Sequence, residues 1–139
     1  MQITRATAIF FALLLLASSA SAADPATDPV VDCRGAPTQG WAAWNILMPP
    51  PPDDFHLVGS VQVGNPGVTA TLTPRVPQGI DPQILIIDLS LHQQPGMWPQ
   101  IVVWTTARYD EGASNQRYTQ VQIYCGSDKI QDVAVTDVH

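Results

Sequence analysis

Histidine and methionine give the chain its clearest capacity for metal chemistry. His92 and Met97 lie five residues apart in LHQQPGMWPQ (91–100), and His56 is a second imidazole upstream. Imidazole with thioether is a ligand set that suits copper. A blue copper site would also need His and Met close to a cysteine, but Cys125 is followed by GSDKIQDV, which contains neither. We therefore expect no metal site, and keep a copper carrier built on these three residues as an alternative hypothesis.

Motifs for catalysis are missing from the sequence. It contains no G-x-S-x-G nucleophile elbow and no H-E-x-x-H zinc motif. The three histidines are far apart in the sequence, and the twelve acidic residues are scattered, so nothing marks a general acid or base. We expect a protein that is not an enzyme and has no cofactor.

The segment 92–99 is instead a candidate recognition loop. Pro95 and Gly96 form its bend, and Met97 and Trp98 follow at the tip. Met and Trp are enriched at protein-binding surfaces, and prolines reduce the entropy lost when a loop docks. The sequence leaves open whether Met97 and Trp98 are exposed or fold back onto the end of the domain.

A second candidate surface is the polar side of the segment 117–125. Strand alternation would place Thr119, Val121, Ile123 and Cys125 on one side, and Tyr118, Gln120, Gln122 and Tyr124 on the other. Aromatic rings stack on sugars while amides bond hydroxyl groups. The sequence therefore also allows a structural protein that binds carbohydrate or the cell envelope.

The N-terminus predicts export. Arg5 precedes the apolar run 8–16, and small residues ending in Ala20-Ser21-Ala22 follow, which is the pattern of a signal peptide cleaved after residue 22. The apolar run is too short for a spanning helix. We expect a mature chain of residues 23–139 that is secreted or periplasmic and not inserted in the membrane.

The charge of the mature chain argues against nucleic acid as a partner. Without Arg5 it has five basic residues against twelve acidic ones, a net charge of −7. Nucleic acid binding requires a basic surface, which this composition does not supply. The leading expectation, from the 92–99 loop, is a protein partner of unknown identity, and the oligomeric state is not predicted.

Two cysteines, Cys33 and Cys125, remain after cleavage. In an exported chain an even pair without C-x-x-C spacing predicts a disulfide. It would tie the N-terminal segment to the penultimate strand.

Strands are expected to position all these residues. Helix formers are scarce, and short alternating runs are separated by Gly- and Pro-rich turns. Whether 41–48 is a strand or a helix stays open, although its flanking Gly40 and Pro49 favour a strand. The expected strands are 41–48, 55–63, 68–73, 84–91, 101–109, 117–125 and 129–138.

These elements predict an all-β fold: an antiparallel β-sandwich of six or seven strands, loosely immunoglobulin-like, with a small barrel as the second choice. The expected organisation is a signal peptide (1–22), an N-terminal segment with a Pro-rich linker (23–54) and a sandwich core (55–139). The leading hypothesis is an exported module that binds another protein through the 92–99 loop, with inhibition of a hydrolase as one form of such binding.

Overall fold

The computed structural model of the chain describes residues 29–114 and 117–139, so the predicted signal peptide lies outside the described residues. The described part is all-β and contains no helix; its eight strands form one curled, mixed sheet. Segment 41–48 falls largely within a strand, as favoured above. The strands are β1 (Val30–Val31), β2 (Thr38–Ile46), β3 (Asp53–Val63), β4 (Val68–Pro74), β5 (Ile84–Gln93), β6 (Val103–Ser114), β7 (Gln120–Cys125) and β8 (Asp128–Val138).

Hydrogen-bonded neighbours follow the order β1-β5-β7-β8-β2-β3-β6, and β4 pairs with β5 beside this path. Two pairs, β5 with β7 and β2 with β8, are parallel. The expectation of a purely antiparallel sheet is therefore wrong. Parallel neighbours need a crossover connection, and the chain between β5 and β7 makes one by way of β6, which pairs with β3 instead.

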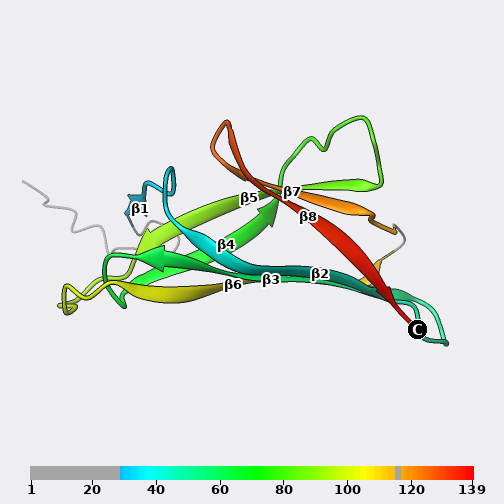
Figure 1. Cartoon of the computed structure of the whole chain (residues 1–139), viewed down its shortest axis with the longest axis horizontal. Coiled ribbons are helices and arrows are strands. Elements are labelled where there is room, and N and C mark those ends of the chain that lie inside the picture. Colours follow the sequence, from blue (N-terminus) through cyan, green and yellow to red (C-terminus); the bar gives the residue numbers. More distant parts are fainter. Residues whose placement is uncertain (1–28, 115–116) are drawn as a thin grey trace, which may run out of the picture.

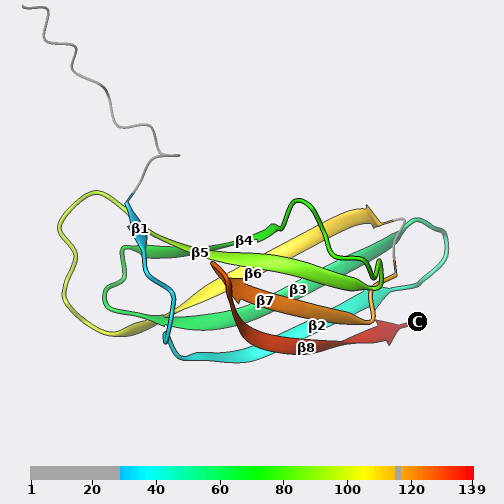
Figure 2. The same ribbon diagram turned by 90° about the horizontal axis from the view of Figure 1, so that it is seen from above.

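β8 joins the two halves of the sheet. Its first part, from Asp128 to Ala134, pairs with β7, and its last part, from Val135 to Val138, pairs with β2. The strands β4, β5 and β7 consequently lie over β2, β3 and β6, as Figures 1 and 2 show. β4 and β6 also lie against each other, although no ladder joins them in the described chain.

The core lies between these two halves. On β3, alternate residues from Phe55 to Val63 are buried, so one side of this strand faces the core. They meet inward side chains of β5 and β7 across the curl. Burying each large aliphatic or aromatic side chain contributes about 1.5 to 3 kcal/mol. The seven largest fully buried side chains are Phe55, Leu57, Val61, Ile87, Leu91, Val121 and Ile123.

Trp41 is partly buried and packs against the core, over Gly59, which has no side chain. A Cβ atom built on Gly59 of β3 would lie 2.2 Å from Cε3 of Trp41. The register of β2 against β3 shifts between Gln39 and Ala42, which is a bulge at the tryptophan. Trp44, three residues later, faces the outside, where its ring lies against His56.

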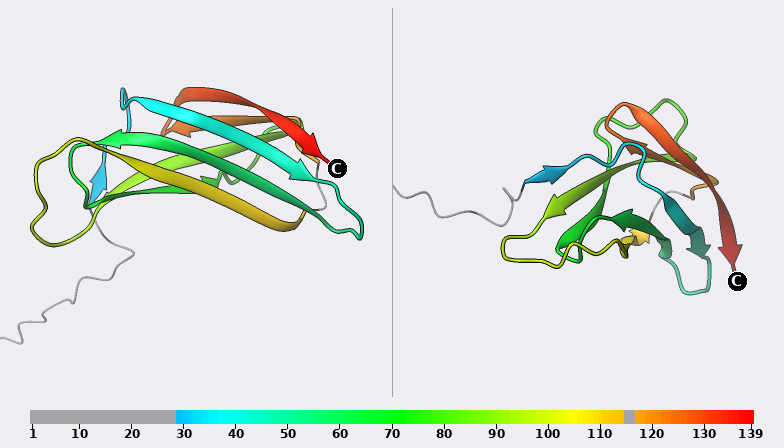
Figure 3. Two further views of the ribbon diagram at one scale, coloured as in Figure 1. Left: turned by 60° about the horizontal axis from the view of Figure 1, so that its bottom comes forward. Right: turned by 60° about the vertical axis from the view of Figure 1, so that its left-hand side comes forward.

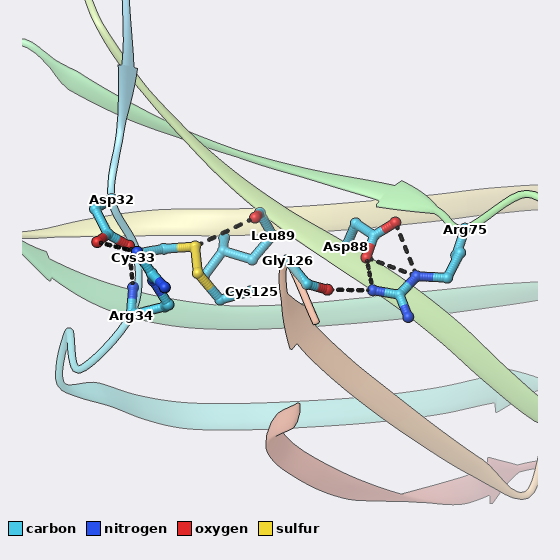
Figure 4. The surroundings of a disulfide bond; sticks show 8 residues. All are labelled: Asp32, Cys33, Arg34, Arg75, Asp88, Leu89, Cys125 and Gly126. Atoms are coloured by element: carbon cyan, nitrogen blue, oxygen red, sulfur yellow. Dashed lines mark hydrogen bonds and ion pairs between the residues drawn. A yellow bond between two sulfur atoms is a disulfide. The ribbon is translucent and has the colours of Figure 1, made fainter. Parts of the chain in front are cut away.

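The predicted disulfide is confirmed between Cys33, which follows β1, and Cys125, the last residue of β7. The two Cα atoms are 5.9 Å apart, and both residues are buried. Figure 4 shows the Cys33 sulfur against the carbonyl oxygen of Leu89 on β5, at 3.6 Å. The bond therefore fixes the start of the described chain to the centre of the β1-β5-β7 region.

Among the described residues, no helix is long and apolar enough to cross a membrane.

Candidate recognition surface

The recognition loop both begins and ends later in the sequence than the predicted range 92–99. β5 continues to Gln93, so His92 is a strand residue, and the connection to β6 runs over residues 94–102. The loop projects from one end of the sheet, next to the turn between β3 and β4 (Figure 1).

Hydrogen bonds to this neighbouring turn fix the base of the loop. The side-chain amides of Asn65 and Gln93 bond each other in both directions, at 2.7 and 3.1 Å. The backbone N–H of Gln94 donates to the carbonyl oxygen of Gly67 at 2.8 Å. The loop therefore leaves the sheet in a fixed direction.

Trp98 folds back onto the same turn. An added Cβ on Gly67 would lie 2.4 Å from Cε2 and Nε1 of the Trp98 ring, and the indole N–H donates to the carbonyl oxygen of Gln94 at 3.1 Å. Of the two arrangements left open by the sequence, Trp98 takes the folded-back one. The indole ring supports the loop, so Trp98 is not available as an exposed contact residue.

Met97, by contrast, is fully exposed. Two further exposed aliphatic side chains follow it in the loop before β6: Ile101 is 58% exposed and Val102 is 61% exposed. We call Met97, Ile101 and Val102 the apolar tip. Pro95 and Gly96, also predicted as contact residues, are exposed beside it, and Gly96 has a φ of 120°, which a side chain would strain.

We expect Gly67→Ala to release Trp98 from its seat, because the new methyl group would overlap the indole ring. The expected result is a red shift in tryptophan fluorescence and faster proteolysis within 94–102, with little change at β7 and β8. Gly64→Ala, in the same turn but with nothing within 4 Å of the added atom, is the control. Identical proteolysis of the two variants would contradict this role of Trp98.

The second predicted surface is not continuous. Gln120, Gln122 and Tyr124 lie on the outward side of β7. Tyr118 precedes the strand and packs against the core, with its ring 4.9 Å from that of Phe55. The expectation that all four share one side is wrong because β7 begins at Gln120, so alternation does not extend back to residue 118.

Tyr124 is also partly covered. The guanidinium carbon of Arg75 lies 4.4 Å from the Tyr124 ring centroid, a cation–π contact. Figure 4 shows the same guanidinium group bonded to Asp88, at 2.6 and 3.0 Å, and to the carbonyl oxygen of Gly126. Arg75 thus connects the end of β4 to β5 and to the β7–β8 turn.

The histidines are placed on different parts of the sheet. Nδ1 of His56 lies 2.5 Å from Asp110 on β6, and Arg108 bonds the other oxygen of this carboxylate at 2.8 Å. Hydrogen bonds from Arg108 and His56 lower the pKa of Asp110. His92 lies on β5, opposite Val30 and Thr69. Within residues 29–114 and 117–139, no three His, Cys, Asp or Glu side chains are grouped to hold a metal ion.

Glu111 is a partly buried polar group that sequence reasoning missed. Tyr109 and Tyr118 both donate their hydroxyl groups to its carboxylate, at 3.0 and 3.1 Å. Burial, together with the nearby Glu111, raises the pKa of Tyr118 to about 12. The spacing of Tyr109 and Glu111, two residues apart on one strand, was the available signal, because such residues share one side.

No protein-family model, curated protein or solved structure matches the chain.

Proposed function

We propose that the chain is an exported binding module that recognises another protein through the apolar tip. The observation that carries the proposal is the full exposure of Met97 on a loop that Trp98 and the β3–β4 turn hold in place. Exposed aliphatic side chains on one short braced loop favour a partner that covers them. The immunoglobulin-like sandwich belongs to this proposal, as the fold class of many such modules.

Bracing strengthens such an interaction because less conformational entropy is lost on binding. Met97 would be the central anchor, since its flexible thioether fills irregular pockets well. Ile101 and Val102 would surround it and exclude water. A protruding rigid tip fits a concave site, such as the substrate cleft of a hydrolase.

Charge gives the proposal a second consequence. No charged residue occurs from Gln93 to Ala107, so the contact would depend on apolar burial. We expect an association that weakens little between low and physiological salt, because ionic strength screens charged contacts selectively.

The test compares two variants that each remove one fully exposed aliphatic side chain. Met97→Ser alters the tip, and Ile80→Ser alters the loop before β5, at the other end of that strand. Immobilised oxidised chain 23–139 is exposed to culture and envelope extracts, and retained proteins are identified. We expect a protein retained by the unaltered chain and by Ile80→Ser, and lost at least tenfold with Met97→Ser. Equal loss or equal retention by both variants would overturn the proposal.

A further inference from the structure

The outer side of β2, β3 and β6 carries a pair of tryptophans that the apolar tip does not include. Trp44 on β2 is opposite His56, and Trp104 on β6 is opposite Gln62; both partners are outward residues of β3. In Figures 1 and 3, no other described strand lies over this side of the sheet. We call it the outer tryptophan face.

The two tryptophans are far apart. His56 and Gln62 are six residues apart on β3, which is roughly 20 Å at the usual rise of a strand. Trp104 is 44% exposed and Trp44 is partly exposed. A single sugar ring or a small ligand could not reach both rings, whereas an extended chain could.

The surface between them consists mostly of small side chains. Ser60 and Thr106 form one cross-strand pair, and Ala42 lies opposite Val58. The one large side chain in this stretch is Arg108, which lies opposite Val58 on β6 and is bonded to Asp110 at 2.8 Å. Ser60, Thr106 and Gln62 supply hydroxyl and amide groups for hydrogen bonds.

The charges on this face are matched internally. Arg108 and His56 both bind Asp110, so the carboxylate is paired on both oxygens. The face therefore presents aromatic rings, neutral hydrogen-bonding groups and a charged pair that is satisfied within the face, while the mature chain as a whole has a net charge of −7 that repels anionic polymers. A ligand of matching character is neutral, rich in hydroxyl groups and extended.

We infer that the outer tryptophan face binds an extended neutral polysaccharide, with Trp44 and Trp104 each stacking on a sugar ring. The aromatic face gives apolar contact to the C–H side of a sugar, and the groups between the rings bond its hydroxyls. This inference is independent of the apolar tip and uses a different ligand.

The test measures depletion of the oxidised chain 23–139 from solution by insoluble cellulose, by chitin and by alginate beads. We expect retention on at least one neutral polymer and none on alginate. Trp44→Ala and Trp104→Ala should each weaken retention at least tenfold, while Met97→Ser should leave it unchanged. Soluble hexasaccharides of the retaining polymer should release the chain, and the monosaccharide should not.

Trp44→Phe keeps an aromatic ring against His56 and should retain measurable binding, and circular dichroism verifies the fold of each variant. Absence of retention on both neutral polymers would overturn the inference, as would equal retention on alginate or retention that neither tryptophan substitution changes. Loss of binding with Met97→Ser alone would assign the polymer to the tip and also overturn it.

Discussion

Replacing both Cys33 and Cys125 with serine is expected to lower the free energy of unfolding by about 4 to 5 kcal/mol. The disulfide joins residues 92 positions apart, so its loss restores the entropy of a long loop to the unfolded chain. A domain of this size is usually stable by about 5 to 15 kcal/mol, so the change removes much of its stability. Urea unfolding followed by circular dichroism measures it.

Reduction of the unaltered chain is the control for this experiment, because it breaks the same bond without changing the sequence. Both treatments should move the unfolding midpoint by a similar amount. A shift below about 1 kcal/mol in both would mean that the packing of β1 against β5 fixes the N-terminal part without the bond.

A methyl group on Gly59 should produce the second large effect. Its Cβ would lie between 2.2 and 2.6 Å from three carbon atoms of the Trp41 ring, so the ring must leave its position in the core. Such overpacking costs about 1 to 3 kcal/mol, and we expect Gly59→Ala to fall at the upper end because the ring is large and all three of its nearest atoms are closer than 3 Å. Thermal and urea unfolding measure the loss.

The double variant Gly59→Ala/Trp41→Leu separates the collision from a general effect of alanine on β3. A leucine side chain in place of the indole makes room for the methyl group, so the added cost of Gly59→Ala should largely disappear in this background. Gly64→Ala, with nothing within 4 Å of the added atom, should change stability by less than about 0.5 kcal/mol. A cost for Gly59→Ala that persists without the tryptophan would contradict the predicted collision.

Local patterns in the sequence predicted the strands well. Alternation located β3 and β5 within two residues at each end, because the side of a strand that is buried is a property of its own residues. The pairing partners could not be read in this way. The parallel β5–β7 and β2–β8 ladders depend on which distant segments meet, and alternation is the same for either direction of pairing.

The candidate loop shows the same limit at the level of single residues. Met and Trp both suit a contact surface, and the sequence did not distinguish their positions. The difference arises because Gly67, on another turn, leaves room for the indole ring of Trp98, whereas Met97 stays fully exposed. Tyr118 was misplaced for a comparable reason, since its position depends on Phe55 and Glu111.

The dual pairing of β8 has a consequence for the order of folding. β8 is the strand that links β7 to β2. Until Asp128–Val138 is available, no ladder among the described strands connects the two halves of the sheet. Most of the pairings join distant residues, which slows folding. During vectorial synthesis from the N-terminus, the complete sheet would therefore form only after its last eleven-residue strand had emerged. Refolding of a chain ending at Gly126 should yield no cooperative unfolding transition.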